Sequence, residues 1–309
     1  MRRLLIIGCG DVALRTIPLL NQGYRVFALV RNPAYFARLR AMGVIPLLGD
    51  LDERNSLSRL AGLADAVLHL APPPNSGIHD TRTRNLLSAL SQVSPEHFDR
   101  FRIHPAPRNR GGGGLPKRLV YISTSGVYGD CGGAWVSETH PLKATSPRAK
   151  RRVDAELQIR DWARRNHVKA SILRVPGIYA EDRLPLDRVQ QGTPGIVSSE
   201  DSYTNHIHAD DLARIAAVAL RRGQACRVYH TSDDSHLKMG EYFDSVADAF
   251  RLPRVPRISR AEAQRVLPES LLSFMNESRR LTNRRMKREL KVRLRYPTVA
   301  DTLAAIKQP

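Results

Sequence analysis

Short apolar runs alternate with helix-length segments through the first half of the chain. Five of these runs predict buried strands, at residues 4–7, 25–30, 44–48, 66–70 and 119–123. Two further strand candidates lie at residues 169–174 and 227–230, and helices are predicted at residues 13–21, 34–42, 80–92 and 149–166. Strands that alternate with helices in this way predict a parallel sheet covered by helices on both faces.

The apolar pattern also divides the chain into two parts. After about residue 179, prolines punctuate shorter segments, which predicts a smaller and more irregular lobe that contacts substrate. We therefore expect an α/β, doubly wound parallel-sheet Rossmann fold over residues 1–178, with residues 203–232 returning to it. Residues 179–202 and 233–309 would form the smaller carboxy-terminal substrate lobe.

Residues 94–117 interrupt the alternation, because they combine several prolines and many charges with four consecutive glycines. Such a segment buries little apolar surface. It predicts a flexible surface insertion, either a tolerated loop or a lid.

A glycine-rich turn follows the first predicted strand and opens the first predicted helix. Its sequence, Gly8-Cys9-Gly10-Asp11-Val12-Ala13, fits G-x-G-x-x-G/A. In this motif the first glycine permits a tight turn, the second lets the backbone approach a pyrophosphate, and the small sixth residue lets the helix pack near the sheet. The free N–H groups at the start of the helix attract the phosphates. The turn predicts a dinucleotide site, and a plain strand–turn–helix is the alternative.

The end of the second predicted strand indicates which dinucleotide binds. An Asp or Glu at this point accepts from the ribose 2′-hydroxyl of NAD, whereas an Arg suits the 2′-phosphate of NADP. The chain carries Arg31 here and has no acidic residue between Gly23 and Pro46. This favours NADP over NAD, unless Arg31 is only a solvated loop residue.

The formal net charge of +19 comes mostly from arginine, which supplies 41 of the 49 basic residues. The arginines are spread along the chain with local clusters at residues 148–152 and 279–291, which favours a basic cleft for an anionic small-molecule substrate over nucleic-acid binding. We read residues 279–291 as a solvated helical face. The sparse cysteines and the absence of a bilayer-length apolar run predict a cytoplasmic chain without a membrane partner.

Several motifs together resemble the extended and atypical short-chain dehydrogenase/reductases, the NAD-dependent epimerase/dehydratase group. They are Val120-Tyr-Ile-Ser-Thr-Ser-Gly-Val-Tyr-Gly129, Gly49-Asp-Leu51, Ser137-Glu-Thr139, Leu173-Arg-Val-Pro-Gly-Ile-Tyr179, His206-Ile-His-Ala-Asp-Asp-Leu-Ala213, and residues 283–290 followed by Tyr296-Pro-Thr298. Their order and spacing cover nearly the whole chain apart from the glycine-rich insertion.

The resemblance implies roles for individual residues. Asp50 and Leu51 would flank the adenine, Ala71 and Pro72 would line the cofactor near its pyrophosphate and nicotinamide ribose, and Ser123 would also contact it. Thr124 would replace the catalytic Ser/Thr that binds the substrate oxygen. The family's Tyr-x-x-x-Lys pair is altered: counting back from Glu156, Arg148 stands at the Tyr position and Arg152 at the Lys position.

The two arginines change the expected chemistry, because a guanidinium stays protonated and cannot act as the proton-transferring base. Tyr128, Glu138, Tyr179 and His208 are substitutes by chemistry alone, although structural roles suit each of them. The resemblance thus implies an NADP-dependent oxidoreductase or epimerase/dehydratase acting on an anionic small molecule such as a nucleotide sugar, with a homodimer as a possible assembly. The alternative is a catalytically degenerate dinucleotide-binding sensor or scaffold protein.

Two other patterns look like sites. His206-x-His208-x-Asp210-Asp211 has metal-ligand residue types, but we expect a short strand leading into a helix capped by Asp210 or Asp211, and no metal. Ser123, Thr124 and Ser125 lack the G-x-S-x-G elbow of a serine hydrolase.

Overall fold

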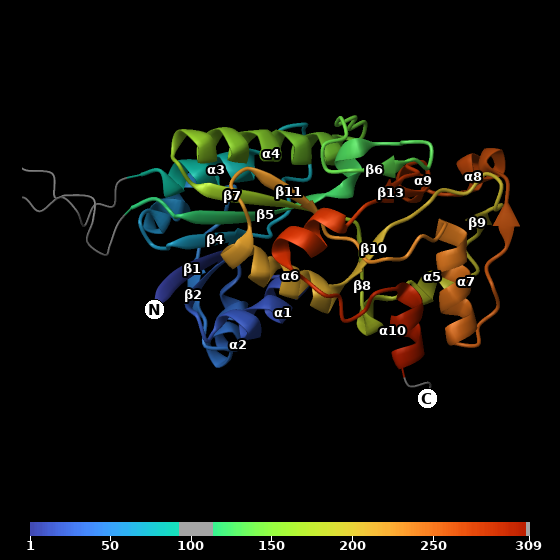
Figure 1. Cartoon of the computed structure of the whole chain (residues 1–309), viewed down its shortest axis with the longest axis horizontal. Helices are drawn as coiled ribbons and strands as arrows, with labels where there is room; N and C mark the ends of the chain where they lie inside the picture. Colours follow the sequence, from blue (N-terminus) through green and yellow to red (C-terminus); the bar gives the residue numbers. More distant parts are fainter. Residues whose placement is uncertain (93–113, 307–309) are drawn as a thin grey trace, which may run out of the picture. The chain divides into compact units, whose positions relative to one another are not determined.

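The computed structural model describes residues 1–92 and 114–306 (Figure 1). Within them the chain forms two compact units. The first comprises Met1–Ser123, Lys150–Leu173 and Ala213–Val228, and the second comprises Thr124–Ala149, Arg174–Leu212 and Tyr229–Pro309. The predicted insertion lies mostly outside the described residues.

A seven-stranded sheet dominates the described part of the first unit, in the order β11-β7-β5-β4-β1-β2-β3. The strands are β1 (Arg2–Ile7), β2 (Tyr24–Val30), β3 (Ile45–Leu48), β4 (Ala66–His69), β5 (Arg118–Thr124), β7 (Lys169–Val175) and β11 (Arg227–His230). Neighbours from β3 through β5 pair in parallel. Each predicted strand is present within two residues of its expected bounds, and the α/β Rossmann-type fold is confirmed.

Helices cover both faces of this sheet (Figure 1). They are α1 (Asp11–Leu20), η1 (Pro33–Tyr35), α2 (Phe36–Ala41), η2 (Arg54–Leu60), α3 (Thr81–Leu90), α4 (Pro147–Arg165) and α6 (Ala209–Arg222). In the figure α3 and α4 lie on one face, and α1 and α2 lie on the other. Among the described helices, none is long and apolar enough to cross a membrane.

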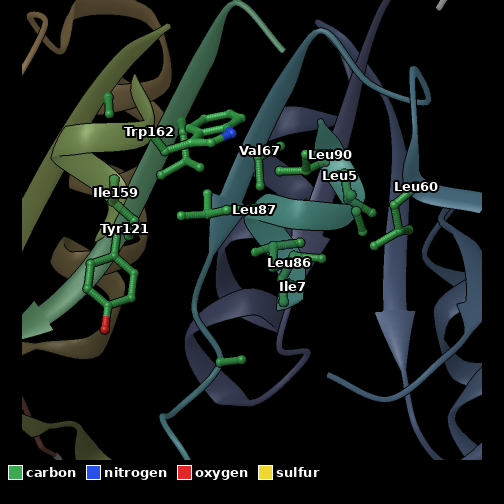
Figure 2. Packing of buried hydrophobic residues seen from close by; sticks show 14 of the residues in the cluster. Leu5, Ile7, Leu60, Val67, Leu86, Leu87, Leu90, Tyr121, Ile159 and Trp162 are labelled. Carbon is green, nitrogen blue, oxygen red and sulfur yellow. The ribbon is translucent and has the colours of Figure 1, made fainter. Parts of the chain in front are cut away.

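One hydrophobic core of the first unit lies between the sheet and helices α3 and α4 (Figure 2). Leu86, Leu87 and Leu90 of α3 pack toward Leu5 and Val67 of the sheet, and all five side chains are at most 5% exposed. Burial of one such side chain stabilises the fold by roughly 1.5–3 kcal/mol, so the core holds the strand ends in fixed positions.

The second unit is built from shorter elements. They are η4 (Ser125–Tyr128), β6 (Trp135–Val136), β8 (Gly177–Tyr179), η5 (Glu181–Arg183), α5 (Leu186–Gln190), β9 (Gly195–Ile196), β10 (His206–His208), α7 (Met239–Ala249), β12 (Arg257–Ile258), α8 (Arg260–Val266), α9 (Glu269–Met275), β13 (Arg280–Leu281), η6 (Met286–Leu290) and α10 (Val299–Ala305). Strand β8 pairs with β10, and β6 pairs with β13. Residues 124–149, 174–178, 203–212 and 229–232 group with this unit, whereas the sequence analysis placed them in the Rossmann domain.

The basic run at residues 279–291 is not a solvated helical face, so that expectation is wrong. Arg279 is 8% exposed and its Nη1 donates to the Gly129 carbonyl at 2.8 Å. The run continues through β13 into the π-helical turn η6, where Met286 and Leu290 are fully buried. Apolar residues within the run draw it into the core, which the charge count alone did not reveal.

Candidate cofactor site

The turn between β1 and α1 depends on Gly8 for steric reasons. Gly8 has φ +90°, a backbone conformation that L side chains rarely adopt. A Cβ at this position would lie 2.5 Å from the Ala71 nitrogen and 2.7 Å from the Ala71 Cα. The loops that follow β1 and β4 therefore approach each other more closely than any other residue would allow.

Gly10 has a different role, because a Cβ at this position would meet no protein atom within 4 Å. Gly10 is the N-cap of α1 and provides no side-chain cap to the first N–H groups of that helix. It leaves a space directly in front of a ten-residue helix. Exposed N–H groups and the positive end of the helix dipole suit a phosphate in that space, so the turn fits a dinucleotide pyrophosphate.

A cavity of about 320 Å³ opens at this turn, at the carboxyl ends of the first strands. Its lining is Ile7, Gly8, Cys9, Gly10, Leu29, Val30, Arg31, Asn32, Tyr35, Gly49, Asp50, Leu51, Ala71, Pro72 and Arg82. The carboxyl edge of an open α/β sheet is where such folds bind ligands. Most of the residues predicted to bind the cofactor thus surround one cavity.

Four of the residues predicted to bind the cofactor do not line the cavity. Asp11 pairs with Arg15 on α1 at 2.9 Å, and Ala13 is buried where α1 meets the sheet. Val12 lies between them in the first turn of α1. The Ser123 hydroxyl donates to the Glu156 carboxylate at 2.7 Å, and both side chains are buried.

Cys9 lines the cavity but does not act as a nucleophile there. Burial raises the pKa of its thiol to about 12, so the sulfur stays protonated at neutral pH. Its contribution to the site is a small, uncharged wall.

Arg31 and Asp50 form the charged side of the cavity. Arg31 follows β2, and its side chain is 66% exposed. Its Nη1 lies 3.9 Å from Asp50 Oδ2, while Asp50 Oδ1 accepts from the Asp52 N–H at 3.0 Å. Asp50 is thus anchored within its own loop, and the exposed guanidinium can pair with an incoming anion.

Arg82 also lines the cavity, and the sequence analysis missed it. Its Nε and Nη2 donate to both carboxylate oxygens of Asp52, at 2.9 and 2.6 Å. Its Nη1 donates to the carbonyls of Pro72 and Pro73, each at 3.3 Å. Hydrogen bonding from Arg82 lowers the pKa of Asp52 below its usual value. Arg82 therefore joins the loops after β3 and β4. The sequence could have indicated this residue, because it lies in the first turn of α3, the helix that follows β4.

Thr124, the expected substrate-binding hydroxyl, is the last residue of β5. Its Oγ1 accepts from the Gly126 N–H at 3.2 Å, which caps the short helix η4. An accepting hydroxyl retains its own proton as a donor. Thr124 is thereby oriented by the turn and can still donate to a substrate oxygen.

Arg152 is turned toward β5. Its Nη1 donates to the Tyr121 hydroxyl at 2.9 Å and to the Ile122 carbonyl at 2.8 Å. Its guanidinium also lies over the Tyr121 ring, 5.6 Å from the centroid. Desolvation raises the pKa of the fully buried Tyr121 to about 12, so this tyrosine does not replace the missing catalytic one.

Arg148, at the family's tyrosine position, is exposed and lies over the Phe274 ring, 4.2 Å from the centroid. This is a cation–π contact within the second unit. A guanidinium remains charged in such a contact. Arg148 thus supplies positive charge and no base.

Tyr128, Glu138 and Tyr179, three of the four substitute proton donors, occupy structural positions. The Tyr128 hydroxyl is buried, accepts from Arg174 Nη1 at 2.6 Å and lies 2.5 Å from His230 Nε2. The buried Glu138 carboxylate accepts from the His230 N–H at 3.3 Å. The Tyr179 hydroxyl is buried and accepts from the Thr302 hydroxyl at 3.3 Å. These contacts occupy each group in holding its own unit together.

The motif from His206 to Asp211 also has structural contacts. His208 Nδ1 accepts from the Asp210 N–H at 3.2 Å and therefore caps α6, a role that we expected of an aspartate. Asp211 accepts from the backbone N–H groups of Arg295 and Tyr296. Across residues 1–92 and 114–306, no group of three or more metal-ligating side chains comes together.

Comparison with curated proteins gives a partial match. A dTDP-glucose 4,6-dehydratase of Mycobacterium tuberculosis is 28% identical over 203 residues, which are 60% of this chain and 56% of that protein. The match thus spans little more than half the length of this relative.

Solved structures match over nearly the whole chain. A functionally unknown conserved protein from Silicibacter pomeroyi is 27% identical, with a TM-score of 0.75 and coverage of 99% of this chain and 98% of that one. A dTDP-glucose 4,6-dehydratase from Streptomyces venezuelae, solved with NAD bound, is 21% identical, with a TM-score of 0.73 and coverage of 98% and 96%. The second likeness shows the fold alone.

The family comparison agrees with these neighbours. The model of the NAD-dependent epimerase/dehydratase family matches residues 16–231. This match begins beyond the glycine-rich turn, so the assignment of the turn itself rests on the geometry of Gly8 and Gly10. The central sheet, the order of motifs and a match over more than half of the chain agree: the protein belongs to the NAD-dependent epimerase/dehydratase family.

Proposed function

We propose that the protein is an NADP-dependent oxidoreductase or epimerase/dehydratase that acts on an anionic small molecule, a nucleotide sugar being the favoured class. The observation that carries the proposal is the Gly10 cradle, the open space before the start of α1 in which a Cβ on Gly10 would meet no protein atom within 4 Å. Gly8, Gly10 and the first turn of α1 would hold the pyrophosphate. Bound there, the dinucleotide would supply the acceptor or donor of hydride.

The preference for NADP rests on Arg31. This side chain lines the cavity at the end of β2 and is 66% exposed. A guanidinium binds a phosphate with two parallel hydrogen bonds, which favours a cofactor with a 2′-phosphate. Asp50 lies 3.9 Å away and keeps the guanidinium close to the cavity.

The substrate class follows from relatives and from charge. A dTDP-glucose 4,6-dehydratase is among the curated relatives, and the chain carries a formal charge of +19. A positive surface draws a diphosphate ester toward the protein. Thr124 would donate a hydrogen bond to the substrate oxygen, and Arg148 and Arg152 would stabilise negative charge without taking up a proton.

Turnover tests the proposal directly. Purified protein is supplied with NADPH or NADP⁺ and a panel of nucleotide sugars and simple carbonyl compounds. Net hydride transfer is followed by the absorbance of the reduced nicotinamide, and conversion of each nucleotide sugar is followed by chromatography, because an epimerase or dehydratase returns the hydride in every cycle. We expect turnover of at least one nucleotide sugar, reduced by Thr124→Ala and unchanged in Ser137→Ala, a hydroxyl variant outside the proposed site. No hydride transfer to any member of the panel would contradict an oxidoreductase.

A catalytically degenerate dinucleotide sensor is the second candidate, and the geometry of Arg152 favours it. This residue is held against Tyr121 and Ile122, and neither it nor Arg148 can exchange a proton at neutral pH. A sensor would bind the dinucleotide as proposed but show no turnover. Turnover by the wild-type protein at a rate typical of enzymes would exclude the sensor function.

A further inference from the structure

A second cavity, of about 460 Å³, lies at the opposite edge of the central sheet, where the strands begin. Arg2, Lys117, Arg118 and Lys169 line it, together with His167 and a single carboxylate, Asp65. All of these residues belong to the first unit. With histidine neutral, four cations and one carboxylate give this lining a formal charge of +3.

Backbone hydrogen bonds place the charged residues side by side along the edge. The Lys169 N–H donates to the Lys117 carbonyl at 3.0 Å, and the Lys117 N–H donates to the Asp65 carbonyl at 2.8 Å. The Asp65 N–H donates to the Arg3 carbonyl at 2.9 Å, next to Arg2. Adjacent strands in a sheet are about 4.8 Å apart, so the register places Lys169 beside Lys117, and Asp65 separates this pair from the arginines at the start of β1.

The only carboxylate in the lining is already engaged. Asp65 Oδ2 accepts from the Arg3 N–H at 2.8 Å. Within residues 1–92 and 114–306, no carboxylate lies within ion-pair distance of Arg2, Lys117 or Lys169. Asp65 offsets only one of the four positive charges in the lining, so the cations still repel one another, a cost that a bound anion reduces.

One wall of the cavity is rigid. Arg118 Nη1 donates to the Gly223 carbonyl at 2.9 Å, which fixes its guanidinium at the edge of the sheet. Both lysines are exposed, and their long flexible side chains allow the ammonium groups to move toward a ligand. A fixed guanidinium together with flexible ammonium groups in one lining suits a chain of phosphates better than a single charge.

We propose that this cavity, the basic edge site, binds a small molecule that carries a diphosphate or a longer phosphate chain. Its volume lies within the range of small-molecule sites. The cations line a concave space, and the aromatic residue in the lining, Tyr24, is only 6% exposed and offers no open face for a base to stack on, so a small polyanion fits better than nucleic acid. The basic edge site is separate from the cofactor cavity, and the proposal does not depend on the proposed function.

Calorimetric titration with inorganic tripolyphosphate tests the proposal. We expect one site in the full-length wild-type protein, with an affinity at least tenfold higher than that for orthophosphate. The double substitution Lys117→Gln and Lys169→Gln removes both positive charges while keeping polar side chains, and it should weaken tripolyphosphate binding at least tenfold. Arg59→Ala with Arg265→Ala removes the same charge at exposed positions outside the lining and should leave the affinity unchanged.

Further arms separate the alternatives. Arg31→Ala alters the cofactor cavity and should not change tripolyphosphate binding. In the Gly10→Ala variant, in which the cofactor cavity should bind its dinucleotide at least tenfold more weakly, tighter binding of ADP than of pyrophosphate would assign the basic edge site to a nucleoside diphosphate, whereas equal binding would assign it to the phosphate chain itself; both support the proposal. Absence of binding in the wild type, unchanged binding in the double lysine variant, or tighter binding of a single-stranded oligonucleotide than of tripolyphosphate would overturn it.

Discussion

Arg152 on helix α4 donates a 2.9 Å hydrogen bond to the hydroxyl of Tyr121, a fully buried residue on strand β5. The same nitrogen also donates to the Ile122 carbonyl at 2.8 Å. An arginine at the position of the family's lysine is therefore part of the fold as well as a candidate ligand for a ribose or phosphate. The substitution retains positive charge and adds a structural contact, but it removes proton exchange.

This pair predicts a measurable coupling. Arg152→Ala leaves the buried Tyr121 hydroxyl without its donor, and a hydrogen bond to a charged group contributes about 1.5–3 kcal/mol. We expect Tyr121→Phe to make Arg152→Ala less costly, with an interaction energy of about 1 kcal/mol or more in a double-mutant cycle measured by urea unfolding. Strict additivity of the two substitutions would show that the hydrogen bond contributes no stability.

Gly8 and Gly10 should respond differently to alanine. Gly8→Ala combines a strained φ with a Cβ 2.5 Å from the Ala71 nitrogen, so we expect a loss of at least about 2 kcal/mol in the free energy of unfolding. Gly10→Ala should change stability by less than about 1 kcal/mol, because its Cβ meets no protein atom within 4 Å. It should instead weaken dinucleotide binding at least tenfold, as measured by calorimetry. Equal dinucleotide affinity of Gly10→Ala and the wild type would show that this turn does not hold the pyrophosphate.

Arg82 should influence acid stability through Asp52. A depressed carboxyl pKa stabilises the fold above the unfolded value, near 3.9, and that stability is lost as pH falls through the folded pKa. The Asp52 side chain is 42% exposed, so solvent screening limits the effect to about 1 kcal/mol or less. Unfolding at pH 7 and pH 3 should show Arg82→Ala less stable than the wild type at pH 7, with a smaller difference at pH 3. A difference that stays the same at both pH values would rule out this linkage.

His69 makes the stability of the fold depend on pH over a higher pH range than Asp52 does. Its Nε2 lies 3.0 Å from the Thr83 hydroxyl, which donates to Asp80 at 2.8 Å, so Nε2 carries the proton. Nδ1 is buried without a partner among the described residues, and burial lowers the pKa of His69 to about 3. The unfolded chain takes up this proton below about pH 6.5 and the folded chain does not, so stability falls as pH drops from 6.5 toward 3.

The expected slope for His69 is at most about 1.4 kcal/mol per pH unit. Between pH 6.5 and pH 4.5, His69→Gln should reduce the slope of the unfolding free energy against pH by up to this amount, which corresponds to the uptake of one proton. His236→Gln, at an exposed position, is the matched control and should keep the wild-type slope. Equal slopes in the wild type and His69→Gln would mean that the buried ring is not the source.

The sequence predicted the fold better than the site. Strands such as residues 4–7 and 66–70 are continuous apolar runs, and the glycine turn is a local pattern, so both can be read from neighbouring residues. Arg82 and the partners of Arg152 were missed because their contacts join residues about 30 positions apart. The run at residues 279–291 was misread because its charges concealed Met286 and Leu290, whose burial depends on packing across the second unit.

Titration of NADP⁺ and NAD⁺ into the wild type, Arg31→Ala and the control Arg38→Ala tests the central claim most directly. Arg38 is exposed on α2 and lies outside the cavity lining, so the control removes the same charge without changing the cavity. We expect the wild type and Arg38→Ala to bind NADP⁺ at least tenfold more tightly than NAD⁺, about 1.4 kcal/mol, and Arg31→Ala to lose that preference while retaining NAD⁺ binding. Equal affinity of the wild type for the two dinucleotides, or binding of neither, would contradict the account.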